Sequence, residues 1–155
     1  MFASRGKRLL FMKKLLIANR GEIAVRILRA ASELGIQTVA VYSEDDSEAL
    51  HCRLADKAIP LKKSGAAAYL DIPQIIQVAV DAGCNAVHPG YGFLSENPEF
   101  ANACSAAGIQ FIGPTVEQLK TFGDKSTARK LAAQCNVPLL KGTDGDTSLD
   151  DAKAF

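Results

Sequence analysis

The sequence has 155 residues, of which 48% are hydrophobic, so it is long enough for one domain with a buried core. Its formal net charge of +1 argues against a nucleic-acid-binding protein and against a disordered acidic tail. No apolar run approaches the roughly 20 residues that a membrane-spanning helix needs, so we expect no membrane association.

The four cysteines give no sign of a zinc site or a disulfide framework. No two of them form a C-x-x-C pair, the spacing typical of such sites. They are Cys52, Cys84, Cys104 and Cys135. We expect reduced thiols, as in a cytoplasmic protein or, alternatively, a protein of the mitochondrial matrix.

The first 14 residues carry five basic side chains and no acidic one, a bias typical of a transit peptide. The segment is short, however, and has no clear cleavage signal. We interpret residues 1–13 as a basic N-terminal extension, with Met12 as a competing first residue.

Residues 15–42 have the pattern of a β-α-β unit. Residues 15–18 are continuously apolar, as in buried parallel strands. From Ile23 apolar residues recur on one helical face until Gly35 ends the helix, and a second strand follows at 37–42. Two pairs of opposite charge on the other face have the i, i+4 spacing of helical ion pairs: Glu22 with Arg26, and Arg29 with Glu33.

This unit raises the possibility of a dinucleotide site, because Glu44 and Asp45 follow the second strand where a ribose-binding carboxylate would lie. The turn at residues 19–24, however, contains one glycine instead of the three in the dinucleotide fingerprint. Nicotinamide binding is therefore the weaker interpretation. We expect the two acids to precede a helix over 47–54, where negative charge suits the helix N-terminus.

Strands and helices continue to alternate through residue 112. The predicted elements are a weak edge strand at 57–61, a loop at 62–68, a helix at 72–81, a strand at 84–87, a helix beginning at Pro98, and a strand at 109–112. Asp71 is expected to cap the first of these helices, and Ser95 or Asn97 the second, with Cys104 on its buried face. The pattern predicts an α/β fold with a doubly wound, mostly parallel sheet and right-handed crossovers.

The loop at residues 88–97, His-Pro-Gly-Tyr-Gly-Phe-Leu-Ser-Glu-Asn, is the strongest candidate for a binding site. Pro89 and Gly90 stop the preceding strand, and Gly92 lets the backbone turn sharply and approach a ligand. In a parallel sheet this loop lies at the carboxyl end of a strand, where ligand crevices form. A simple reversal of the chain is the alternative, but Tyr91 between two glycines is a poor choice for it.

Residues 115–134 contain two further helices. Thr115 and Gln118 have capping-box spacing for a helix ending at Gly123, and Asp124 can cap a helix from Lys125 to about residue 134. A lysine in the first turn opposes the helix dipole and is unfavourable unless an anion such as phosphate lies nearby. A solvated lysine that costs roughly a few tenths of a kcal/mol is an equally good explanation.

A last helix begins after Thr147 or Ser148, but the sequence ends at Phe155 before this helix could bury an apolar face. We therefore expect the sequence to be a truncated part of a longer protein.

Three motifs, in this order, resemble the N-terminal domain of biotin carboxylase, the ATP-grasp component of biotin-dependent carboxylases. They are Ile-Ala-Asn-Arg-Gly-Glu-Ile-Ala at 17–24, the ten residues at 88–97, and Gly-Asp-Lys at 123–125. The resemblance implies a Rossmann-like pre-ATP-grasp domain at residues 14–123. It also implies that residues 124–155 are the start of an ATP-grasp region, truncated before the main part of that domain.

The resemblance implies that the complete protein uses ATP, Mg²⁺ and bicarbonate to make carboxyphosphate, and then carboxylates the ureido nitrogen of biotin. Lys125 matches the family lysine that contacts the nucleotide. Tyr91 and Gly92 match positions beside the biotin pocket. Arg29 and Glu33 match positions at the interface of a homodimer.

The family's metal-binding carboxylates and the residues that hold bicarbonate and activate biotin lie beyond Phe155. The resemblance therefore implies no catalytic or metal-binding residue in this chain, and we expect the chain alone to be inactive. A carboxyltransferase component, as the partner of the complete protein, would choose the acyl acceptor.

Two alternatives of other classes remain open from the sequence. One is the equivalent domain of another ATP-grasp ligase, such as the large subunit of carbamoyl-phosphate synthetase, although the motif around Tyr91 argues against it. The other is a dimerisation module without chemistry of its own.

Overall fold

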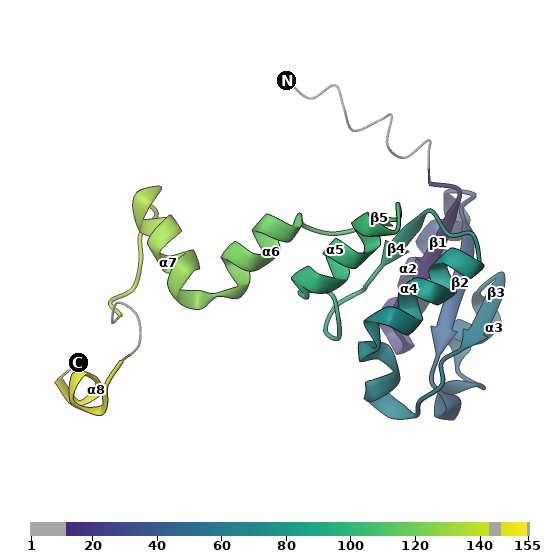
Figure 1. Cartoon of the computed structure of the whole chain (residues 1–155), viewed down its shortest axis with the longest axis horizontal. Helices are drawn as coiled ribbons and strands as arrows, with labels where there is room; N and C mark the ends of the chain where they lie inside the picture. The colour runs from purple at the N-terminus through teal and green to yellow at the C-terminus, as the bar shows by residue number, and fades with distance from the viewer. Residues whose placement is uncertain (1–11, 143–146, 155) are drawn as a thin grey trace, which may run out of the picture.

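The computed structural model describes residues 12–142 and 147–154, and its centre is a five-stranded parallel sheet (Figure 1). The strands lie in the order β3-β2-β1-β4-β5. Their bounds are β1 Lys14–Ile17, β2 Gln37–Tyr42, β3 Lys57–Pro60, β4 Ala86–His88 and β5 Gln110–Phe111. The α-helices are α2 Gly21–Glu33, α3 Leu50–Leu54, α4 Ile72–Asp81, α5 Pro98–Ala106, α6 Val116–Gly123, α7 Lys125–Gln134 and α8 Leu149–Ala154. Two short 3-10 helices are η1 Glu44–Asp46 and η2 Gly65–Leu70.

Helices cover both faces of the sheet because side chains alternate along each strand. In the central strand β1, Leu15 and Ile17 belong to the same apolar cluster as the buried side of α2. Leu16 and Ala18 belong to a second cluster with apolar side chains of α4 and α5. Figure 1 shows α4 in front of the sheet and α2 behind it. The predicted α/β fold with a doubly wound parallel sheet is therefore confirmed.

Beyond β5 the chain leaves the sheet, and α6, α7 and α8 extend away from it (Figure 1). The first of these helices still packs on the domain, because its Leu119 is buried in the cluster of α4 and α5. The second, α7, buries none of its residues.

The predicted caps are confirmed. Asp71, Thr115 and Asp124 each accept a hydrogen bond from the backbone N–H three residues later, at the starts of α4, α6 and α7. At α5 the cap is Asn97 and not Ser95, with 2.9 Å between the Asn97 Oδ1 and the Phe100 nitrogen.

The helix predicted over residues 47–54 begins only at Leu50, as α3, and the acidic residues before it form η1. The acidic residues before it accept hydrogen bonds from the next loop, which holds them in a 3-10 turn: Glu44 from the Ser64 hydroxyl and Asp45 from the Gly65 N–H. The loop predicted at 62–68 is likewise partly helical, because η2 begins at Gly65.

The strands after α4 and α5 differ from their predicted bounds. The strand predicted at 84–87 is observed at Ala86–His88, and the one predicted at 109–112 is observed at Gln110–Phe111. The edge strand containing Pro60 lies at the end of the sheet, as predicted.

All four cysteines have free thiols. Cys104 is buried on α5, as predicted, and this burial raises the pKa of its thiol to about 11. Within the described part of the chain, no helix has both the length and the apolar character to cross a bilayer. The basic extension at 1–13 lies almost entirely outside the described residues.

Candidate functional site

The candidate site lies where the loops after β1 and β4 meet. In the sheet, β2 lies on one side of β1 and β4 lies on the other. The chain therefore leaves the carboxyl ends of β1 and β4 in opposite directions, which opens a space between the loops that follow these two strands. The Ala18 N–H donates to the His88 carbonyl at 2.9 Å and brings the two loops together. The first two sequence motifs therefore meet at the position where open α/β sheets bind ligands.

The Asn19 side chain joins the loop after β1 to the loop after β4 by hydrogen bonds. Its Nδ2 donates to the carbonyls of Pro89, at 2.7 Å, and Tyr91, at 2.9 Å, while its Oδ1 accepts from the Arg20 N–H at 2.9 Å. The side chain is only 3% exposed. Both amide protons are thus used on backbone carbonyls of the loop after β4.

Gly90 is required by this contact. Its φ is +67°, a conformation that L side chains rarely adopt, and a Cβ built on it would lie 2.7 Å from Asn19 Nδ2. The Asn19 amide therefore leaves no room for a side chain at position 90.

Tyr91 and Gly92 lie on the outer side of the same loop. The Tyr91 ring is 63% exposed, and its hydroxyl donates to Glu22 Oε2 at 3.3 Å. Gly92 has φ +66° and open space where a Cβ would be. The loop thus presents an aromatic ring and a bare stretch of backbone, as the sequence predicted.

Phe93 anchors the far side of the loop. It has a positive φ of 38°, which is uncommon for a residue other than glycine, and its ring stacks on Tyr69 with centroids 5.0 Å apart. Tyr69 is fully buried, donates to Asp46 Oδ2 at 2.8 Å and accepts from the Ser43 N–H at 3.1 Å. Burial raises the pKa of Tyr69 to about 12, so it remains a neutral donor.

Arg20 extends this network to the start of α2. Its Nη2 lies 2.7 Å from Asp46 Oδ1, and its guanidinium carbon is 6.0 Å from the centre of the Tyr69 ring. The loops after β1, β2 and β4 are therefore joined through side chains that the sequence interpretation missed. Arg20 and Asp46 lie shortly after predicted strands, whereas nothing in the sequence singled out Tyr69.

His88 closes β4 and stabilises the turn that follows. Its Nδ1 accepts from the Gly90 N–H at 3.0 Å, which requires the unprotonated form of that nitrogen. Burial lowers the pKa of the imidazole below its ordinary value.

Lys125 is not part of this cluster. It is the exposed first residue of α7, a helix that projects from the domain beyond α5 and α6 (Figure 1). Asp124 caps the helix by accepting from the Thr127 N–H at 2.7 Å, so one backbone donor is already used.

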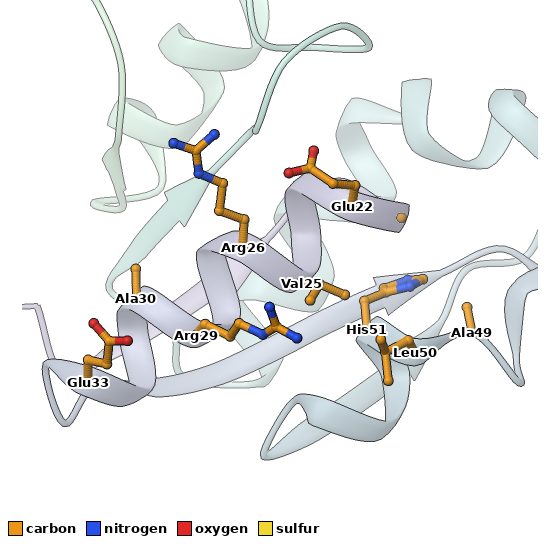
Figure 2. Close-up of a pocket in the computed structure, with 10 residues that line it drawn as sticks. Glu22, Val25, Arg26, Arg29, Ala30, Glu33, Ala49, Leu50 and His51 are labelled. Carbon is orange, nitrogen blue, oxygen red and sulfur yellow. The ribbon is translucent and has the colours of Figure 1, made fainter.

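Arg29 and Glu33 line a cleft of about 690 Å³ between α2 and α3. Figure 2 shows Arg29 directed toward the α3 side, where His51 and Leu50 lie, and Glu33 at the other end of α2. Neither Arg29–Glu33 nor Glu22–Arg26 forms an ion pair, although all four residues are described. The predicted helical ion pairs are therefore wrong, because exposed pairs gain little and leave their long side chains free.

Within residues 12–142 and 147–154, no group of three His, Cys, Asp or Glu side chains could hold a metal ion. The arrangement presents a shaped backbone and an aromatic surface to a ligand.

Comparison with known proteins finds one family over most of the chain. The family model described as biotin carboxylase, N-terminal domain, matches residues 11–119. The mitochondrial pyruvate carboxylase of Mus musculus is 52% identical over 147 residues, which cover 93% of this chain and 12% of that protein. The chain thus spans only a small part of this curated relative.

Solved structures give the same result. The biotin carboxylase domain of a single-chain bacterial carboxylase matches with a TM-score of 0.89 and 56% identity, over 92% of this chain and 33% of that one. The biotin carboxylase domain dimer of Hydrogenobacter thermophilus 2-oxoglutarate carboxylase, in complex with MgADP, ADP and bicarbonate, matches with a TM-score of 0.89. It is 44% identical and covers 92% of this chain and 32% of its own.

Proposed function

The chain belongs to the family of biotin carboxylase N-terminal domains, and from this we propose that it is the first part of an ATP-dependent biotin carboxylase. The complete protein makes carboxyphosphate from ATP and bicarbonate and carboxylates the ureido nitrogen of biotin. The observation that carries the proposal is the junction of the two motif loops at the switch point of the sheet, held by Asn19.

We assign Tyr91 and Gly92 to the surroundings of biotin. The exposed ring and the glycine backbone beside it lie at the carboxyl edge of the sheet, which supports contact with a small ligand. A phenol ring and a glycine backbone offer a surface and hydrogen-bonding groups. Their role is therefore to shape and orient, and the proton and carboxyl transfers belong to other parts of the protein.

We assign Lys125 to the nucleotide. Its ammonium group stands in the first turn of α7, where a cation is unfavourable by itself and a phosphate would be favourable. In the full-length protein, Lys125→Met should raise the KM for ATP, whereas Lys130→Met, an exposed lysine farther along α7, should leave it unchanged. Equal effects of the two substitutions would contradict the assignment.

Among the described residues, no three His, Cys, Asp or Glu side chains come together as a metal-binding group. We propose that the chain alone does not cleave ATP. The metal, bicarbonate and biotin-activating groups would belong to the rest of the protein, and the acyl acceptor to its carboxyltransferase component.

We place the interface of a homodimer on α2, around Arg29 and Glu33. Both side chains are exposed and unpaired with one another, so they are available to a second subunit. A relative with 44% identity is described as a biotin carboxylase domain dimer, which supports this assignment. A dimerisation module without chemistry of its own is the second candidate function, favoured by the exposed charged side chains of Arg29 and Glu33 on α2.

We propose the division into a basic extension at 1–13, the N-terminal domain at 14–123 and the start of the ATP-grasp region at 124–155. The helix α7 projects from the packed domain, which supports a boundary between residues 123 and 124.

We propose a cytoplasmic location, with the mitochondrial matrix as the alternative, since one relative is named as mitochondrial.

Phosphate release by the full-length gene product with ATP, Mg²⁺ and bicarbonate, with and without free biotin, tests the proposal. We expect biotin to stimulate release. Bicarbonate-dependent release that is indifferent to biotin would instead favour another ATP-grasp ligase, such as the large subunit of carbamoyl-phosphate synthetase.

A further inference from the structure

We propose that Asn19 is a positioning residue for biotin: it holds the carbonyls of Pro89 and Tyr91 so that the Tyr91–Gly92 backbone is presented in one conformation. The inference rests on the proposed function, because it assumes that this loop lies beside biotin. Asn19 itself touches no reacting atom.

The hydrogen bonds of Asn19 match the chemistry of a carboxamide. Two carbonyls need two donors on one atom, and Nδ2 supplies them at 2.7 and 2.9 Å. Oδ1 accepts from the Arg20 N–H, which fixes the amide against rotation. Asp has no donor in its ionised form, and Ser or Thr has only one, so neither could hold both carbonyls.

The loop needs such a restraint because its backbone is in an unusual conformation. Gly90, Gly92 and Phe93 have φ of +67°, +66° and +38° within four residues. A positive φ is ordinary for glycine, but for Phe93 it persists only where the surroundings determine it, and such residues cluster at ligand sites. The Tyr69 stack fixes Phe93, whereas Asn19 fixes the other end of the turn.

Tyr91 lies between these two anchors. Its carbonyl is bonded inward to Asn19, while its ring remains exposed and reaches Glu22 through a long hydroxyl contact of 3.3 Å. The inward bond therefore sets the orientation of the Tyr91–Gly92 peptide at the carboxyl edge of the sheet. Losing it should weaken biotin binding more than nucleotide binding, since Lys125 lies on α7 outside this cluster.

The test uses the full-length protein and measures the KM of free biotin, of ATP and of bicarbonate by phosphate release. Asn19→Ala removes all three contacts. Asn19→Asp keeps the volume and the acceptor for the Arg20 N–H but loses the two donors. We expect both variants to raise the KM for biotin about tenfold and to change the other two constants less than about twofold.

Asn85→Ala is the matched control. The Asn85 Oδ1 accepts from the N–H groups of Lys13 and Lys14, both at 3.1 Å, so it also joins β1 to a segment distant in sequence. It lies at the amino end of β1, away from the candidate site. A general loss of stability should occur in the Asn19 variants and in Asn85→Ala alike. A rise in the biotin KM should occur only in the Asn19 variants.

A biotin KM that rises in both Asn19 variants, with the ATP and bicarbonate constants steady and Asn85→Ala unaffected, supports the proposal. It is overturned if either folded Asn19 variant keeps the wild-type biotin KM, if all three constants rise together, or if Asn85→Ala has the same effect. If Asn19→Ala does not fold, Asn19→Asp decides. Failure of both to fold, with Asn85→Ala folded, would make Asn19 purely structural and would also overturn the proposal.

Wild-type enzyme whose phosphate release does not respond to biotin would refute the proposed function, and this measurement involves no substitution. Failure of the proposed function can therefore be distinguished from failure of the role proposed for Asn19.

Discussion

Gly90→Ala should destabilise the domain more than a matched glycine substitution, because its new Cβ meets the Asn19 amide. Gly35 provides the match: both residues have φ +67°, but a Cβ at Gly35 has nothing within 4 Å. At both sites the left-handed conformation costs an L residue about 1–2 kcal/mol. The loss of unfolded-state entropy on replacing Gly by Ala is also common to the two sites.

The contact at Gly90 adds to this shared cost. The Cβ would lie 2.7 Å from Asn19 Nδ2 and 3.0 Å from Cγ, so the amide must move away from its two acceptors. Each hydrogen bond contributes about 0.5–1.5 kcal/mol net. Gly90→Ala should therefore lower the free energy of unfolding by about 1–3 kcal/mol more than Gly35→Ala.

Urea unfolding of the chain and its two variants measures the difference, provided that the m-values agree. In an Asn19→Ala background the extra cost should shrink, because the two nearest atoms are gone and only the Cβ at 3.1 Å remains. Equal losses for Gly90→Ala and Gly35→Ala, within about 0.5 kcal/mol, would refute the proposed contact.

Two further predictions concern the buried polar groups. Burial lowers the pKa of both His51 and His88 from 6.5, so the unfolded chain binds protons more readily in the window just below that value. As far as these groups are concerned, the free energy of unfolding should be maximal above about pH 7.5 and should fall as the pH is lowered through about 6.5 toward the lower pKa values of the folded state. Replacing both histidines by Asn should flatten this dependence in urea titrations, and an unchanged slope would contradict it. Tyr69→Phe should lower the free energy of unfolding by about 1–3 kcal/mol, because the buried hydroxyl both donates and accepts. Tyr42→Phe is its control, and equal small losses from the two substitutions would argue against the network.

The sequence predicted the elements whose signals are local. The apolar run in β1, the caps of α4 to α7 and the edge position of Pro60 depend on neighbouring residues, and each was confirmed. The loop around Tyr91 could also be selected, because glycine, proline and an exposed aromatic residue stand together in it.

The contacts that hold the loop could not be predicted in the same way. Asn19 and Pro89 are 70 positions apart, and they meet only because β4 lies directly beside β1. Tyr69 reaches Asp46 through η2, which was expected to be an irregular loop. Conversely, the i, i+4 spacing of Arg29 and Glu33 suggested an ion pair that the structure does not contain. Helical spacing alone is a weak predictor for exposed pairs, because each charge is also well solvated by water.

We propose that the full-length protein carboxylates biotin. Incubation with isotopically labelled bicarbonate, ATP, Mg²⁺ and free biotin, followed by separation of the products, measures this directly. We predict label attached to biotin, dependent on ATP and in proportion to the phosphate released. Phosphate release with no label on biotin would contradict the account and leave the Tyr91 loop without its proposed ligand.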